Sequence, residues 1–208
     1  AKGTATTTLN LVAPSGVATV NTMKGYDTKD STLTSNNSEK QEATIDTYGE
    51  EKQVTIEGII TNNYSNSLEN MMILGRIPFT GNKVIDEDTT LGSTFTMQMN
   101  SKITTSGIDS SRVKIYYSTN GEASKDLLGA NNGWTENPSD FSSIKSYLIV
   151  VSGKVAASTQ LQFNYTVSLP GNLEYGNSSY QMYKVYFDNK TETATIGETK
   201  ESGIVGLT

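Results

Sequence analysis

The sequence predicts an all-β protein whose antiparallel sheets pack face to face. Apolar and polar residues alternate along several short segments, and clusters of Gly, Pro and Asn separate these segments. Helical periodicity is nowhere sustained over the roughly ten residues that a helix needs. Many short strands without intervening helices are typical of a β-sandwich, and we expect about eleven strands.

The clearest strand is predicted from Leu161 to Leu169, where five apolar residues alternate with four polar ones before a Pro-Gly-Asn turn. The run from Ser146 to Val151 is apolar on both faces, which predicts a central strand. Similar alternation predicts strands at 54–61, 95–100 and 112–117, and weaker patterns predict them at 6–12, 17–23, 42–48, 70–77, 180–187 and 193–199. Short helical turns are expected near 123–128 and after Pro138, where Ser139-Asp140 would cap one.

The length of 208 residues fits one large sandwich or two small ones. No internal repeat divides the chain into equivalent halves. The polar stretch 29–40 reads either as a linker or as a long loop within one sandwich. We predict a single domain over 1–208, and the alternative is a boundary near 40–50 that separates a small N-terminal β piece or extension.

Composition excludes several classes of function. The chain has no His and no Cys, which removes the Ser-His-Asp triad, cysteine nucleophiles and the usual zinc, haem and iron–sulfur ligands. Sixteen scattered Lys and Arg in a chain of net charge −6 argue against nucleic-acid binding. No run approaches the roughly 18 apolar residues of a membrane span, so we expect no direct membrane insertion. The 29 Thr, 23 Ser and 18 Asn suit solvent-facing strands and turns and favour an extracellular protein.

Two groups of motifs resemble a known family. The segment from Lys52 to Phe79, KQVTIEGIITNNYSNSLENMMILGRIPF, has a strand that ends in Thr-Asn-Asn, a polar turn and a second strand that stops at Ile-Pro-Phe. This pattern resembles the extracellular repeats of large Gram-positive surface proteins. The segments YYSTNGEASKDL, NGW, IKSYLIV, SLPGNL and the final SGIVGLT are similar to the later half of the same repeat.

The resemblance implies an immunoglobulin-like β-sandwich in a tandem array on a cell-wall-anchored protein. Its role would be structural or adhesive, as a stalk repeat or in cell adhesion, without enzymatic activity or a cofactor. Neighbouring repeats in the same chain are the implied partners, and host or cell-wall glycans or proteins are further candidates. The family offers no catalytic or binding residue to carry over.

Several charged residues are candidates for a metal site or a covalent crosslink. Asp86-Glu87-Asp88 is the densest carboxylate cluster, but it lacks the EF-hand spacing, and a solvated acidic turn is the preferred interpretation over a calcium site. Asp27 and Asp30 are weaker candidates. A Lys–Asn isopeptide bond, which such stalk domains often contain, has candidate residues that no pattern singles out: Lys24, Lys52, Glu57, Asn164 and Asn189.

Catalysis and sugar binding remain as alternatives to a structural role. Paired carboxylates serve glycoside hydrolysis, but no motif places Asp109, Glu122, Asp126 or Glu136, and we predict that the protein is not an enzyme. A carbohydrate-binding module is the alternative function. Its platform would use Asn131-Asn132-Gly133-Trp134 or the tyrosines Tyr175, Tyr180 and Tyr183, although a sole Trp and alternating Tyr are usually core residues.

Overall fold

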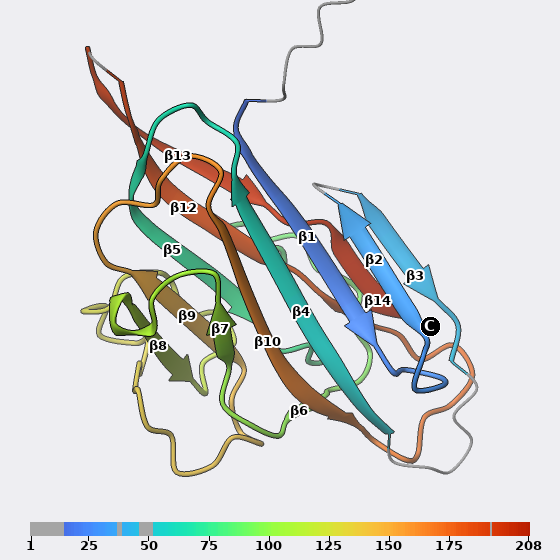
Figure 1. Cartoon of the computed structure of the whole chain (residues 1–208). Coiled ribbons are helices and arrows are strands. Elements are labelled where there is room, and N and C mark those ends of the chain that lie inside the picture. Colours follow the sequence, from blue (N-terminus) through green and yellow to red (C-terminus); the bar gives the residue numbers. More distant parts are fainter. Residues whose placement is uncertain (1–14, 37–38, 46–51, 192) are drawn as a thin grey trace, which may run out of the picture.

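A computed structural model of the chain describes residues 15–36, 39–45, 52–191 and 193–208, and the all-β prediction is confirmed (Figure 1). The described residues form fourteen strands and a short 3-10 turn, Ser110–Arg112. The strand expected at 6–12, and the part of 42–48 from residue 46 on, lie outside the described residues. The strands are β1 Val17–Lys24, β2 Thr32–Asn36, β3 Lys40–Ala43, β4 Lys52–Asn62, β5 Leu68–Arg76, β6 Gln98–Met99, β7 Thr104–Ser106, β8 Val113–Ser118, β9 Ser146–Val151, β10 Gln160–Leu169, β11 Ser179–Gln181, β12 Tyr183–Lys190, β13 Thr195–Glu201 and β14 Ile204–Leu207.

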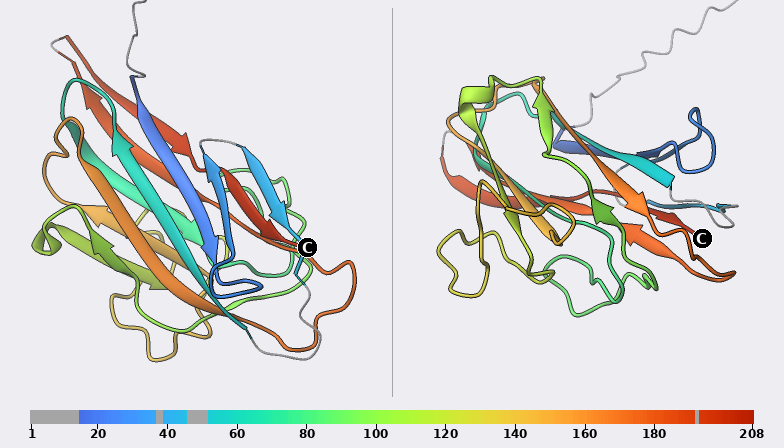
Figure 2. Two further views of the ribbon diagram at one scale, coloured as in Figure 1. Left: turned by 45° about the vertical axis from the view of Figure 1, so that its right-hand side comes forward. Right: turned by 90° about the horizontal axis from the view of Figure 1, so that it is seen from below.

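The strands are arranged in two facing layers (Figure 2). One layer is the six-stranded sheet, ordered β2-β1-β4-β10-β6, in which β7 also pairs with β10. The other layer is the five-stranded sheet, ordered β13-β12-β5-β9-β8. A three-stranded sheet, β11-β14-β3, follows on from it, because only Met182 separates β11 from β12 and only Ser202-Gly203 separates β13 from β14. The pairing of β14 with β3 is parallel, whereas the other ladders between the described strands are antiparallel.

The core lies between the two layers and follows the alternation in the sequence. Along β10, burial switches between buried and half-buried at every residue from Leu161 to Leu169, as the period-two pattern predicted. The central aromatic contacts cross the layers: the Phe163 ring lies 5.6 Å from that of Tyr147 and 5.2 Å from that of Tyr183, in edge-on geometry. Burial of these side chains supplies the main driving force for packing the sheets.

Two glycines make room for these rings. A Cβ added at Gly58 would lie 2.3 Å from the Phe163 ring, and one added at Gly75 would lie 2.1 Å from the Tyr147 ring. Each glycine is the direct cross-strand partner of the aromatic residue that covers it. The two rings therefore lie flat across neighbouring strands that carry no side chain at that point.

A second apolar cluster covers the opposite face of the five-stranded sheet, here called the outer face. Leu74 and Leu148 from the sheet pack there with Ile85 and Leu91 from a covering loop. This cluster explains why β9 is apolar on both faces, since its alternate residues belong to the two clusters. The prediction of a central strand at 146–151 is confirmed by its pairing with both β5 and β8.

Several local expectations were wrong. The polar stretch 29–40 contains β2 and the first residue of β3 rather than only loop or linker, because backbone pairing with β1 and β14 orders it without apolar alternation. The segment 123–128 has no helical turn, since side chains from 118–134 hold it as an irregular loop. After Pro138, Asp140 caps a turn by accepting the Ser142 N–H at 2.9 Å, but no helix follows. The strand expected at 95–100 is reduced to β6.

Candidate functional site

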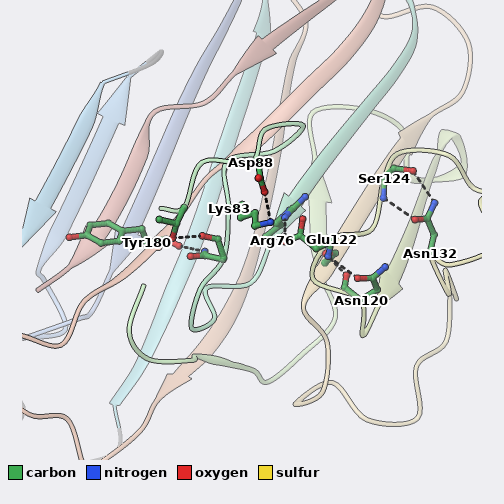
Figure 3. A network of polar contacts seen from close by, with 11 residues as sticks. Arg76, Lys83, Asp88, Asn120, Glu122, Ser124, Asn132 and Tyr180 are labelled. Carbon is green, nitrogen blue, oxygen red and sulfur yellow. Dashed lines mark hydrogen bonds and ion pairs between the residues drawn. The ribbon is translucent and has the colours of Figure 1, made fainter. Parts of the chain in front are cut away.

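The outer face carries a network of polar contacts between loops (Figure 3). Its floor is the second apolar cluster, and two loops, 77–97 and 119–145, lie over it. Arg76, at the end of β5, is buried beneath them with only 5% of its side chain exposed. One Nη of Arg76 lies 3.2 Å from a Glu122 carboxylate oxygen, and its Nε has no hydrogen-bond partner among the described residues. The guanidinium therefore ties the loop 119–145 to the sheet.

The acidic turn Asp86-Glu87-Asp88 is held by cations on both sides. The Asp86 carboxylate lies 3.3 Å from Lys184 Nζ and accepts the Tyr186 hydroxyl at 2.5 Å. Asp88 pairs with Lys83 at 2.6 Å, and this contact lowers the pKa of the Asp88 carboxyl. Within the described residues, no three carboxylates gather in a way that would hold a metal ion. The carboxylates of Asp86 and Asp88 serve as partners for lysines rather than as a preformed oxygen cage.

The groups expected to form a sugar-binding platform around Trp134 make contacts within their own loop. Trp134 is half-buried against the second apolar cluster, and its indole N–H donates to the Ser124 carbonyl at 3.1 Å. Asn132 is buried, accepts the Ser124 N–H at 3.0 Å and donates to the Asp126 carbonyl at 2.6 Å. Both groups are thus engaged in folding the loop, which Figure 3 shows for Ser124 and Asn132.

The three candidate tyrosines lie in different surroundings. Tyr183 is fully buried between the layers, and Tyr180 is buried in the second apolar cluster with Lys40 Nζ 4.4 Å from its ring centroid. Tyr175 is fully exposed. The structure therefore does not bring these three rings together as one binding surface.

The candidate isopeptide residues are only partly brought together. Lys24 on β1 forms an ion pair with Glu57 on β4 at 3.0 Å, and Asn164 on β10 is the cross-strand partner of Glu57. The Asn164 side chain accepts a hydrogen bond from Thr104, and Glu57 also accepts one from Gln162. Lys52 pairs with Asp27 at 3.7 Å, while the Asn189 amide donates to Glu198, so these two belong to other clusters.

The four candidate catalytic carboxylates have separate partners. Asp109 caps the 3-10 turn by accepting the Ser111 N–H, which lowers the pKa of its carboxyl. Glu122 pairs with Arg76, and Glu136 lies 3.8 Å from Lys114. Asp126 accepts the Leu128 N–H at 3.0 Å. Each of the four carboxylates therefore has its own partner within the fold.

Two surface features were missed from the sequence. Leu127 and Leu128 form the tip of the loop 119–134, and the Leu128 side chain is 93% exposed. A hollow of about 300 Å³ lies elsewhere, and its lining is mainly apolar. Consecutive leucines inside a polar, glycine-rich loop were the available sequence signal for the tip. The hollow had none, because its residues come from three separate segments: Thr44, Ile45, Leu173, Glu174, Tyr175, Gly176, Asn177 and Thr208.

The first and last strands place the two ends of the described sandwich far apart. In Figure 1, β1 begins at one end of the long axis, and β14 runs toward the marked C-terminus near the other end. The turned view in Figure 2 agrees. Eight residues of β1 pair with β4, from Val17 opposite Asn62 to Lys24 opposite Thr55. In the part of the chain described, no helix has the length and apolar character to cross a membrane.

Comparison with known proteins gives distant similarities of structure only. No family model and no curated protein matches the chain. The full-length major pilin SpaD of Corynebacterium diphtheriae is similar over 91% of this chain and 34% of its own, with a TM-score of 0.41 and 9% identity. AggA, the major subunit of aggregative adherence fimbriae type I of Escherichia coli, is similar over 85% of this chain and 93% of its own, with a TM-score of 0.35 and 12% identity. A C-terminal fragment of the major pilin GBS80 of Streptococcus agalactiae is similar over 80% of this chain and 51% of its own, with a TM-score of 0.34 and 10% identity. The chain thus spans about a third of SpaD and about half of the GBS80 fragment.

Proposed function

We propose that the chain is a structural or adhesive module of a cell-wall-anchored surface protein of a Gram-positive bacterium. It would act as one unit of a stalk, with neighbouring domains of the same protein as its partners. The main support for the proposal is the placement of β1 and β14. The start of β1 and the end of β14 lie toward opposite ends of the sandwich. A chain pulled from both sides would load these strands along their length.

Loading along the strand axis favours mechanical strength for a simple reason. When a strand is pulled along its axis, all the ladder hydrogen bonds share the load and must break together. When paired strands are pulled apart from one end, the bonds break one after another, at a lower force. The eight-residue pairing of β1 with β4, and the five-residue pairing with β2, would be loaded in the first way.

Polar contacts between the layers add to this resistance. The Thr19 hydroxyl on β1 donates to the Glu201 carbonyl at 3.1 Å, at the end of β13. The Asn21 amide donates to the Gly203 carbonyl at 2.7 Å, directly before β14. Because both contacts join β1 to the C-terminal strands, tension entering at one end would reach the other through a short path across the core.

Single-molecule force spectroscopy tests the proposal. The chain has no cysteine, so handles can be attached at two introduced ones. We expect the variant Ser15→Cys, Thr208→Cys to unfold at a clearly higher force than Ser15→Cys, Asn63→Cys, in which the same sandwich is pulled from one end of the β1–β4 ladder. Matched melting temperatures of the two variants would serve as the control. Equal unfolding forces for the two double-cysteine variants would contradict the proposed load-bearing role.

Carbohydrate binding, the alternative function, has less support. Trp134 and Asn132 are engaged within their loop, and Tyr180 and Tyr183 are buried. Of the candidate aromatic residues, Tyr175 is fully exposed and Trp134 half-buried, and a single fully exposed ring without convergent polar groups is a weak basis for a sugar site.

A further inference from the structure

The five-stranded sheet ends in an open strand. β13 is the last strand in the order β13-β12-β5-β9-β8, and β12 is the only described strand that pairs with it. The Ser202 N–H donates to the Tyr183 carbonyl, which fixes the alternation of this antiparallel ladder. Alternate residues of β13 therefore point their backbone N–H and C=O groups away from the sheet: Thr195, Gly197 and Thr199. In the described part of the chain, no residue forms a hydrogen bond with these groups.

The same edge is filled farther along the chain. β14 continues the line of β13 after Ser202-Gly203, and β3 pairs with β14 on the side away from β11. Because β11 continues into β12, β3 occupies beside β14 the place that stays vacant beside β13. From the described residues, the outward backbone groups of β13 receive one hydrogen bond, from the Thr19 hydroxyl to the Glu201 carbonyl. A position for one further strand thus remains along 195–200, here called the vacant edge.

The vacant edge is uncharged in one half. Its charged residues lie between Glu198 and Glu201, whereas Ala194 to Gly197 carry none. Ile196, in the uncharged half, has 50% of its side chain exposed, and β13 contains no proline that would block pairing. Unpaired backbone groups beside an exposed apolar side chain form a ready template for a further strand.

We propose that the vacant edge pairs with β13 of a second copy, in an antiparallel ladder about a two-fold axis. Every copy presents the same edge, and a two-fold axis sets two identical strands antiparallel, so the contact is self-complementary. Charge decides the register, because like charges directly opposite each other are destabilising. An axis at Glu198 would place two carboxylates face to face. An axis at Ile196 places the two isoleucines face to face instead, in the uncharged half.

The register with its axis at Ile196 also matches the backbone groups. It sets Thr195 of one copy opposite Gly197 of the other, and both residues point their N–H and C=O groups outward. Glu198 then lies opposite Ala194, which carries no charge. Pairing in this register therefore satisfies open backbone groups and covers the Ile196 side chains without bringing like charges together.

The contact is weak because it is small. A ladder of a few residue pairs buries far less than the roughly 1,200 Å² of a stable protein–protein interface, and the net charge of −6 on each copy opposes association. Copies held close together on one surface still populate it, because tethering raises their effective concentration to about the millimolar range. The contact joins separate molecules, so it does not depend on the proposed role of the chain as a unit within a stalk.

Single introduced cysteines test the register, because the chain has none of its own. In the proposed ladder the two Ile196 residues form a non-hydrogen-bonded pair with Cα atoms about 4.5 Å apart, which a disulfide can span. Ile196→Cys should therefore give a disulfide-linked dimer in an oxidising glutathione buffer at millimolar protein. Lys200→Cys is the matched control on the same strand and face. In this register the two copies of residue 200 lie about 26 Å apart and should not crosslink.

Sedimentation equilibrium without crosslinking measures the contact itself. Wild type should form a dimer at millimolar concentration and grow no further, since two-fold pairing uses the vacant edge of both copies. Gly197→Pro removes an outward N–H that β12 does not use, and Ile196→Asp places two carboxylates opposite each other. Each variant should dissociate at least about tenfold more readily than wild type. Tyr175→Asp, which makes the same charge change at a fully exposed ring elsewhere, should associate like wild type.

Four outcomes would overturn the proposal. Wild type that stays monomeric at millimolar concentration would remove the contact, and a lowered melting temperature of Gly197→Pro would then indicate that a segment of the same chain fills the vacant edge. Growth beyond the dimer would indicate a head-to-tail contact. Crosslinking of Lys200→Cys as readily as of Ile196→Cys would indicate random encounters. Unchanged association of both Gly197→Pro and Ile196→Asp would place the contact on another surface.

Discussion

The hydroxyl of Tyr183, on β12, donates across the sandwich to the carbonyl of Val20, on β1, at 2.7 Å. The Ile59 carbonyl on β4 lies 3.1 Å from the same hydroxyl and offers a second acceptor. Val20 and Ile59 are direct cross-strand partners, so one tyrosine fastens the five-stranded sheet to two strands of the six-stranded sheet. Its neighbours Tyr147 and Tyr165 are equally buried, but their hydroxyls face only each other, and neither donates to a backbone carbonyl.

This difference predicts opposite effects for the same substitution. Tyr183→Phe keeps the ring but removes the single O–H donor that faces the Val20 and Ile59 carbonyls, and we expect a loss of about 1–2 kcal/mol in the free energy of unfolding. Tyr147→Phe removes a buried hydroxyl that donates to no carbonyl and faces only the Tyr165 hydroxyl, and we expect no loss or a gain of up to about 1 kcal/mol. Urea denaturation of both variants measures the difference.

Tyr165→Phe is the matched control for that comparison, because its hydroxyl likewise faces only that of Tyr147 and it should behave like Tyr147→Phe. The interpretation would fail if Tyr183→Phe were as stable as wild type while the other two lost stability. That result would mean that the hydroxyls of Tyr147 and Tyr165, rather than that of Tyr183, hold the layers together.

Arg76 and Glu122 give a second prediction. Glu122→Gln removes the carboxylate that faces a buried guanidinium, and we expect a cost of about 1–3 kcal/mol. Asp88→Asn removes the partner of the exposed Lys83, and we expect no measurable change. Thermal unfolding compares the two. If the pair acts as a unit, Arg76→Met combined with Glu122→Gln will cost less than the sum of the single changes.

The acidic turn yields a third prediction. Because Asp86 and Asp88 are already paired with Lys184 and Lys83, we expect millimolar calcium or a chelator to leave the melting temperature unchanged. Asp86→Asn should lower it, since Lys184 and Tyr186 lose an acceptor. A rise in melting temperature with calcium that Asp86→Asn abolishes would restore the calcium interpretation.

The strands that alternate were predictable from the sequence, and the strands that depend on distant pairing were not. β4 and β10 follow the period-two pattern because one face of each lies in the core. β2 and β3 have no such face: of their residues, only Ser35 is buried. β2 is ordered by pairing with β1, the strand before it, and β3 by pairing with β14 at the far end of the sequence. Neither pairing leaves an apolar alternation in the local sequence.

The same reasoning applies to the candidate site. The sequence does not distinguish Trp134, Tyr175 and Tyr183 as sugar-binding candidates, but in the structure their exposure ranges from fully buried to fully exposed. An aromatic side chain suits a core and a binding platform equally well. Trp134 is half-buried because it packs against the second apolar cluster on the outer face. Loops contribute to that cluster, and no short motif predicts their positions.

A fourth prediction concerns the number of folding units. Asn21 on β1 is buried and donates to the carbonyls of Gln181, at the end of β11, and Gly203, directly before β14. If the N-terminal strands belong to one cooperative unit, Asn21→Ala will cost about 2–3 kcal/mol and lower the whole transition. The sole tryptophan, Trp134, lies in the second apolar cluster, so its fluorescence reports unfolding at a site remote from Asn21.

We expect Trp134 fluorescence and circular dichroism to show one shared transition in wild type, and the same downward shift in Asn21→Ala. An early transition seen only by circular dichroism would indicate a separate N-terminal piece, as the alternative boundary near 40–50 requires.

The absence of histidine and cysteine gives a last prediction, a flat dependence of stability on pH around neutrality. In acid, the hydrogen bonds from Ser111 to Asp109 and from Ser142 to Asp140 lower the pKa of these carboxyls. A lowered folded-state pKa stabilises the fold above the unfolded value of about 3.9, and this contribution is lost as the pH falls through the folded value. Stability should therefore decline only below about pH 4.

In alkali the pKa shift that matters is upward, so the stability that it provides is lost as the pH rises. Burial, together with the hydrogen bond to Glu198, raises the pKa of Tyr64 to about 12. A raised tyrosine pKa stabilises the fold below the unfolded value of about 10, and this contribution is lost as the pH rises toward 12. Urea denaturation at a series of pH values should show a plateau from about pH 5 to pH 9 and a fall above about pH 10. Tyr64→Phe should reduce the alkaline fall, and Tyr175→Phe, at a fully exposed ring, should not. A step near neutral pH would contradict this account, because no side chain of the sequence has an ordinary pKa there.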